Sequence, residues 1–247
     1  MNLKRKIEKI KEEIVKKTKP LSVFIYGSYV TQDFLPGVSD VEIGVIKKGS
    51  RPVFKTLKKI ANKYSTNSTN FRIYSYHLED LKRHKIDSPF TDTIFLRRLI
   101  LSSKTIWGHS IIESIPLPFI DLIDIYREAC FSTAMALSAL FMVRIGNSEE
   151  ASERVSKACL FATACLEYLN KEFPVTFKDI LESSKSLKLN QKQKKLIKFA
   201  YNLRIGKKNP RQEELFTFIY ETIRYCNGTI EERIKRDLRR GNRIVLR

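Results

Sequence analysis

Two carboxylates separated by one residue stand in an apolar run, where Asp40 and Glu42 flank Val41. Residues two apart in a β-strand point to the same face of the sheet, so both acids would aim at one point. Two converging carboxylates suit a hard cation such as Mg²⁺ or Mn²⁺, with water and phosphate oxygens completing its shell. The spacing therefore predicts a metal site made by Asp40 and Glu42.

A glycine and a serine precede these acids in the chain. Gly27-Ser28 ends an apolar run and opens a polar loop that carries Pro36 and Gly37. Glycine permits close backbone approach, and the serine hydroxyl with the free N–H groups of the turn can hold phosphate oxygens. A phosphate-holding turn beside a metal-holding strand is what nucleotidyl transfer requires, because the turn clamps the triphosphate and the cation offsets charge in the transition state.

The hydrophobic pattern predicts the elements that position these residues. Apolar residues at helical spacing alternate with short runs rich in β-formers in the first half of the chain. We therefore expect an α+β N-terminal domain, a mixed sheet flanked by helices, over residues 1–115. The expected strands are 21–26, 38–46, 71–76 and 104–108, and the expected helices are 2–17, 52–64, 79–84 and 91–103.

The character of the sequence changes at Pro116 and Pro118. Beyond them, long helical patterns are joined by short loops, which favours an all-α antiparallel helical bundle over residues 116–247 that ends in a basic tail. The expected helices are 121–145, 148–172, 176–184, 190–205 and 211–240, with Asn227-Gly228 as a candidate interruption of the last.

The motif resembles that of the nucleotidyltransferase superfamily, which includes DNA polymerase β and the kanamycin nucleotidyltransferases. The family pattern is an apolar residue, Gly-Ser, a spacer of about ten residues, then two acids around an apolar residue. Here it stands as Tyr26-Gly27-Ser28 and Asp40-Val41-Glu42. The resemblance covers roughly residues 20–108. In its helix order alone, the C-terminal region resembles the helical domains of these enzymes and the HEPN-like bundles.

The resemblance implies that Gly27 and Ser28 bind a nucleoside triphosphate and that Asp40 and Glu42 are catalytic and bind Mg²⁺ (or Mn²⁺). The implied reaction moves a nucleoside monophosphate, AMP from ATP, to an acceptor hydroxyl. Active members usually carry a third carboxylate on a following strand, but the matching run 71–76 holds no acid. Arg72 stands about where that acid is expected, and we interpret it as a nucleotide-binding residue.

Two functions therefore stay open at this point. The first is a Mg²⁺-dependent nucleotidyltransferase. The second is a catalytically degenerate nucleotidyltransferase fold that acts as a nucleotide- or RNA-binding module, because Arg72 would repel Mg²⁺ and attract phosphate.

Composition adds a strong positive charge, with 46 Lys and Arg against 27 Asp and Glu, a net charge of +19. Such a field attracts RNA or another polyanion, although a lysine-rich proteome bias gives the same count. No apolar run reaches the roughly 20 residues that span a bilayer. We expect a cytoplasmic protein without a membrane partner, and a homodimer through the helical region is an option.

Overall fold

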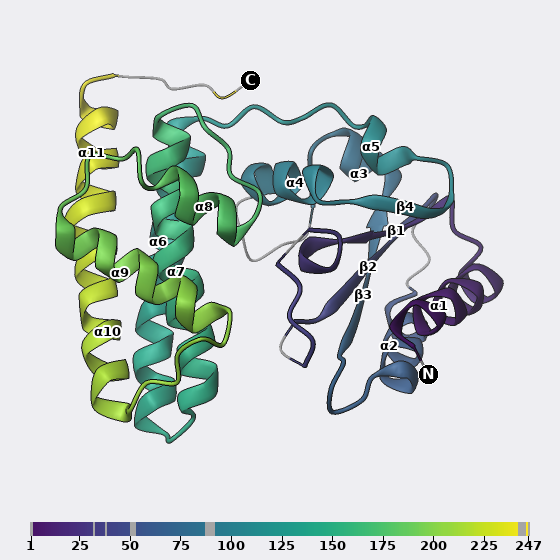
Figure 1. The fold of residues 1–247 in the computed structure, drawn as a ribbon. Helices are drawn as coiled ribbons and strands as arrows, with labels where there is room; N and C mark the ends of the chain where they lie inside the picture. The colour runs from purple at the N-terminus through teal and green to yellow at the C-terminus, as the bar shows by residue number, and fades with distance from the viewer. Residues whose placement is uncertain are drawn as a thin grey trace. The chain divides into compact units, whose positions relative to one another are not determined.

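The computed structural model describes residues 2–31, 33–37, 39–49, 53–86, 92–241 and 246 (Figure 1). The chain folds into two compact units, Met1–Ser88 with Phe95–Pro118 and Pro89–Ile94 with Phe119–Arg247. The first unit holds a mixed sheet with flanking helices and the second is helical, so the predicted fold class is confirmed. The predicted domain boundary after residue 115 stays a prediction.

The four strands of the sheet lie in the order β3-β2-β1-β4. Strand β1 is antiparallel to both of its neighbours, whereas β2 and β3 are parallel. In this register Glu42 lies between Tyr26 of β1 and Arg72 of β3. The strands are β1 Ser22–Tyr26, β2 Val41–Lys47, β3 Phe71–His77 and β4 Lys104–Gly108. All four predicted strands are thus present, and Val38, the predicted start of the second, lies outside the described residues.

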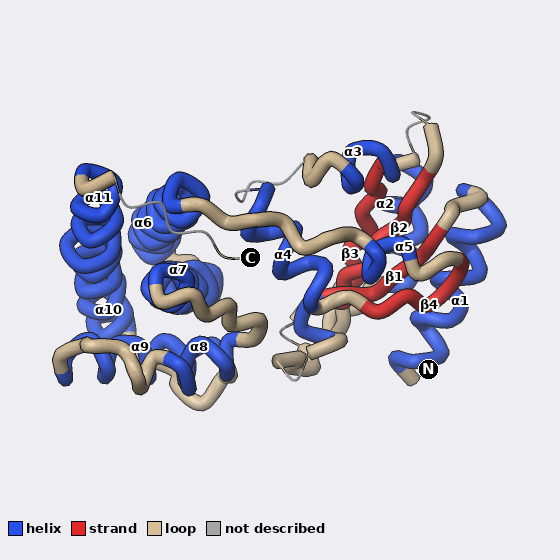
Figure 2. The backbone as a smooth tube through the Cα atoms, turned by 90° about the horizontal axis from the view of Figure 1, so that it is seen from above, coloured by secondary structure: helices blue, strands red, loops and turns tan. Residues whose placement is uncertain are grey.

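Helices cover both faces of the sheet, as Figure 2 shows for the first unit. Alternate strand residues such as Val23 and Ile43 form one core with α1 and α2, which contribute Ile10 and Ile60. The other face packs against α3, α4 and α5. The helices are α1 Leu3–Thr18, α2 Phe54–Tyr64, α3 Leu78–Lys82, α4 Asp92–Leu101 and α5 Ile111–Ser114. The sequence predicted all of these except α5.

Aromatic rings fill the face of the sheet that also carries the two acids. Phe24 lies opposite Gly44 across β1 and β2, and a Cβ atom on Gly44 would lie 2.0 Å from the Phe24 ring. Phe24 also contacts Tyr26 and Tyr76, with ring centroids 5.7 and 5.8 Å away. Gly44 is therefore required here by packing, since any side chain would displace the buried ring.

The helical unit is built around the antiparallel pair α6 and α7. Figure 2 looks nearly down the axes of α6, α7 and α10. Their apolar faces share one core with α9. Among the helices of the described ranges, none combines the length and the apolar character that crossing a membrane demands. The helices are α6 Leu122–Arg144, α7 Ser148–Leu169, α8 Phe177–Ser183, α9 Gln191–Arg204, α10 Gln212–Arg224 and α11 Glu232–Arg239.

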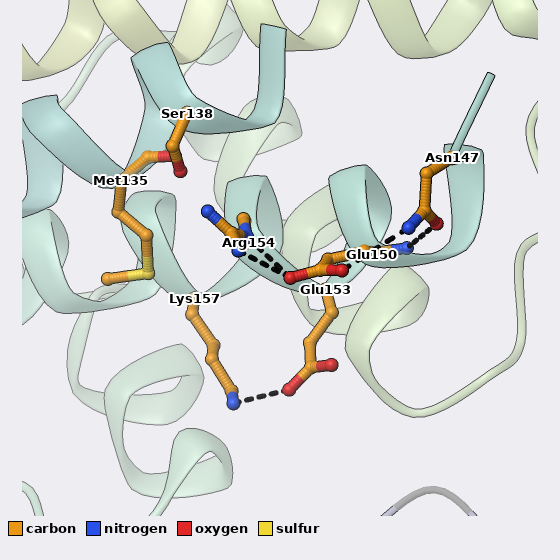
Figure 3. A network of polar contacts seen from close by, with 7 residues as sticks. All are labelled: Met135, Ser138, Asn147, Glu150, Glu153, Arg154 and Lys157. Atoms are coloured by element: carbon orange, nitrogen blue, oxygen red, sulfur yellow. Dashed lines mark hydrogen bonds and ion pairs between the residues drawn. The ribbon is translucent and has the colours of Figure 1, made fainter. Parts of the chain in front are cut away.

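Helix α7 begins at a polar network (Figure 3). The Asn147 side chain accepts a hydrogen bond from the Glu150 backbone N–H at 3.1 Å and so caps the helix. One turn further on, Arg154 and Lys157 pair with Glu150 and Glu153. Exposed pairs at this spacing contribute about 0.3–0.5 kcal/mol each. The Asn147 cap and these two ion pairs therefore stabilise the start of α7.

The predicted last helix contains a π-helical segment, η2 (Tyr225–Glu231), between α10 and α11. The three pieces form one continuous column in Figure 1. The Asn227-Gly228 pair that suggested an interruption lies within η2. The chain thus changes from α-helical to the wider π-helical geometry at this point and remains helical.

Glu167 of α7 is fully buried in the helical unit. Burial raises the pKa of its carboxyl to about 8, Glu172 and Asp179 add to the increase, and the Ser183 hydroxyl opposes it. At neutral pH the folded chain therefore holds a proton here that the unfolded chain releases. Because the folded state binds more protons between the ordinary pKa and the raised one, stability falls as pH rises through this range.

We therefore expect the wild type to lose stability relative to Glu167→Gln as pH rises from 5 to 8, because Gln stays neutral. The slope of this difference should approach about 1.4 kcal/mol per pH unit. Denaturant unfolding at several pH values measures it. Glu182→Gln, an exposed acid of α8, is the matched control and should follow the wild type. Parallel curves for wild type and Glu167→Gln would contradict the raised pKa.

Candidate functional site at the end of the parallel strand pair

Asp40 is held at both of its carboxylate oxygens. The Asn70 amide donates to Oδ1 at 2.8 Å, and the Nε of Arg72 pairs with Oδ2 at 2.8 Å. The backbones meet as well, because the Val41 N–H donates to the Asn70 carbonyl at 2.8 Å. Asp40 and Asn70 each stand one residue before parallel strands that pair in register. The register thus fixes the position of Asp40 through neighbours on the next strand.

Arg72 places a positive charge between the two predicted metal ligands. It pairs with Asp40 and lies beside Glu42 in the register of β2 and β3. Burial lowers the pKa of the Arg72 guanidinium, but Asp40, Tyr74 and Glu42 outweigh it and the net shift is upward. The side chain is 53% exposed. Arg72 therefore stays charged and can be reached by a ligand from solvent.

Glu42 lies against the Gly27 turn. A Cβ atom on Gly27 would lie 2.6 Å from Oε2 of Glu42, and the φ angle of Gly27 is +72°. Side chains rarely adopt such backbone angles, so glycine is favoured here by conformation as well as by space. The Gly27 N–H donates to Oγ of Ser102 at 3.3 Å, which ties the turn to the end of α4. A carboxylate and the predicted phosphate turn are therefore direct neighbours.

Ser28 sits in the single 3₁₀ turn η1 (Gly27–Tyr29) that follows β1 directly. The first N–H groups of such a turn have no acceptor within it. The Tyr29 ring packs edge-on against Phe34 at 5.3 Å. A turn thus follows the first strand directly, as the Gly27-Ser28 pair predicted.

Two tyrosines, the buried Tyr26 and the half-buried Tyr76, lie beside these residues on the same face of the sheet. The hydroxyls of Tyr26 and Tyr76 lie 3.2 Å apart. Burial raises the pKa of both, and the charge of Glu42 adds to the increase. Both phenols therefore stay neutral at physiological pH, so the charge at this end of the sheet is carried by Asp40, Glu42 and Arg72.

Four of the five residues that the sequence singled out form two contacting pairs, and Ser28 follows Gly27 in the turn. Glu42 meets the Gly27–Ser28 turn, and Asp40 meets Arg72. Sequence reasoning missed Asn70 and Ser102. Asn70 could have been found, since it precedes its strand as Asp40 precedes the neighbouring one, whereas nothing local marks Ser102.

The donor set suits a nucleotide-bound Mg²⁺, which usually takes one or two carboxylates together with substrate phosphates and water. Each carboxylate oxygen of Asp40 keeps lone-pair capacity beyond its present hydrogen bond. Among the described residues, no group of three or more His, Cys, Asp or Glu side chains could hold a metal ion. Because Arg72 already pairs with Asp40, it would compete with any cation for that carboxylate, while Glu42 faces the turn.

Comparison with known proteins agrees with the fold class. Residues 7–103 match the family model of the nucleotidyltransferase domain. This part of the chain is a nucleotidyltransferase domain.

Among solved structures, the chain is similar to the spectinomycin adenyltransferase AAD(9) from Enterococcus faecialis, crystallised with ATP and spectinomycin. The TM-score is 0.60 at 14% sequence identity, over 93% of this chain and 100% of that chain. At this identity the match shows a shared fold. No curated protein matches the sequence.

We expect the Asp40–Arg72 pair to contribute little to stability, because the two side chains are 28% and 53% exposed. Asp40→Asn and Arg72→Gln should each lower the free energy of unfolding by less than about 1 kcal/mol. A double-mutant cycle by denaturant unfolding measures the coupling. A coupling above about 2 kcal/mol would show that the pair is structural and would contradict this expectation.

Proposed function

We propose that this chain transfers a nucleoside monophosphate, AMP from ATP, to an acceptor hydroxyl. The observation that carries the proposal is the contact between Glu42 and the Gly27 turn, with Asp40 two residues away on the same strand end. This arrangement puts two carboxylates at a turn whose backbone donors suit phosphate. The ATP in the structure of the AAD(9) adenyltransferase supports the choice of donor nucleotide.

Each residue has a role that its position supports. Gly27 and Ser28 hold the triphosphate, Asp40 and Glu42 hold Mg²⁺ (or Mn²⁺), and Arg72 contacts a phosphate oxygen through its exposed guanidinium. A bound ion would offset the charge that builds up on the transferred phosphorus group. The positive charge of Arg72 also offsets the negative charge of the two carboxylates, which would otherwise repel the triphosphate as it approaches.

A second candidate is a catalytically degenerate fold that binds nucleotide or RNA without turnover. The 2.8 Å contact between Arg72 and Asp40 favours it, because the cation takes up a metal ligand. The net charge of +19 would draw such a module to a polyanion.

Pyrophosphate release from ATP distinguishes the two candidate functions. The true acceptor need not be known for this assay, because water serves as a weak acceptor. We expect release with Mg²⁺ or Mn²⁺, its loss on chelation, and a drop of at least about 100-fold in Asp40→Asn and Glu42→Gln. Unfolding curves would show that both variants are folded. Tight ATP binding with no release, and no labelled transfer to RNA, proteins or aminoglycosides, would reject the enzyme. RNA binding that weakens steeply with salt would then support the binding module.

Gly27 and Gly37 offer a matched pair for testing the turn. Their φ angles are +72° and +82°, so alanine is strained at both and should cost about 1 kcal/mol. Only at Gly27 would the new Cβ meet Glu42, whose flexible end would move aside. We expect Gly27→Ala to weaken ATP binding about tenfold and Gly37→Ala to leave it unchanged, as measured by calorimetric titration. Equal ATP affinities of the two variants would show that the turn is not part of the nucleotide site.

A further inference from the structure

The helical unit contains a cavity of about 600 Å³. It is lined by the end of α7, the segment 186–189, the π-helical segment η2 and the face of α11, and it opens to solvent, since Lys188, Glu232 and Arg236 are exposed. Its size falls within the range of about 300–1,000 Å³ that is typical of small-molecule pockets.

One side of this cavity is apolar. Leu166, Leu169, Leu187 and Leu189 line it, and three of them pack against the core of the helical unit. Leu187 is itself buried. The cavity therefore has an apolar wall that a hydrocarbon or aromatic group could cover.

The other side is charged and mainly basic. Lys188, Arg233 and Arg236 line it, opposed by the carboxylate of Glu232. Arg233 pairs with Asp237 at 3.1 Å. Within the described part of the chain, Lys188 and Arg236 have no acidic partner within 4.0 Å. The cavity thus carries cations whose charge is not neutralised by the protein.

Gly228 lines the cavity for no evident structural reason. A Cβ atom there would meet nothing within 4 Å, and its φ angle lies outside the left-handed region. Glycine within a helix costs stability relative to alanine, so neither conformation nor packing favours it. Gly228 is exposed at the wall of the cavity, and a larger side chain there would occupy open space.

The backbone around Gly228 is π-helical, because Gly228 lies within η2. The neighbouring Thr229 accepts a hydrogen bond from the Gln193 amide of α9 at 3.0 Å, which ties the segment to the bundle. π-Helical turns occur frequently at functional sites, because they re-aim residues that a regular helix would place elsewhere.

We propose that this cavity binds a small organic anion that carries an apolar group. The anionic group pairs with Arg236 and Lys188, and the apolar group covers the leucine wall in the space left open by Gly228. The inference rests on the helical unit alone and does not depend on nucleotidyl transfer.

Titration with the fluorescent sulfonate 1-anilinonaphthalene-8-sulfonate tests whether the cavity can hold an aromatic anion. The wild type should bind it with enhanced fluorescence, and Gly228→Leu, which fills the cavity, should lose this binding. Gly228→Ala is a milder variant that should weaken it, and circular dichroism confirms the fold of both. Unchanged binding in folded Gly228→Leu would overturn the proposal.

The contribution of the positive charge of Arg236 to binding is tested with Arg236→Gln. The control is Arg239→Gln, because Arg239 is an exposed arginine of the same helix that does not line the cavity. Arg236→Gln should weaken binding of the probe about fivefold, whereas Arg239→Gln should not change it. Hexanoate should displace the probe and hexylamine, with the same chain and opposite charge, should not. Equal effects of the two variants, or displacement by hexylamine alone, would overturn the choice of an anion.

Discussion

The in-register pairing of the parallel strands β2 and β3 is the constraint on which the candidate site depends. It sets Asp40 beside Asn70 and Glu42 beside Arg72, although about thirty residues separate the members of each pair along the chain. Side chains of paired residues share a face, so a shift of one residue would turn Arg72 away from both acids. The cores on the two faces hold this register, because Ile43 of β2 and Phe71 of β3 are buried on one face of the sheet and Ile46 of β2 is buried on the other.

The elements with strong periodicity could be predicted from the sequence, and so could the two acids and the turn. Short apolar runs rich in β-formers located all four strands, and Asp40 and Glu42 were singled out because their spacing matches the two-residue period of a strand. Contacts between distant residues could not be predicted in the same way. Ser102 reaches the Gly27 N–H only because α4 ends beside the turn, and no local pattern records that approach.

Arg72 shows how position and charge together limit the chemistry of the site. As a sequence feature it indicated a missing acid and a nucleotide-binding residue, and the structure adds that its Nε contacts Asp40 at 2.8 Å. The same guanidinium remains half exposed, so a triphosphate can compete for it with the carboxylate. A phosphate that draws Arg72 away would leave an oxygen of Asp40 for a cation. The ion pair is therefore compatible with nucleotide binding, and the balance between phosphate and carboxylate decides whether turnover follows.

The glycines show how a structural requirement can be separated from a functional one. Gly27 has a left-handed backbone and a carboxylate where its side chain would be, and Gly44 lies under the Phe24 ring. Both positions would resist substitution in a protein with no activity at all. Gly228 has neither constraint, because its backbone is not left-handed and its missing side chain faces open space. Gly228 lowers helix propensity without easing any local strain, so the folded chain itself gives no reason for it, and the proposed ligand of the cavity would supply one.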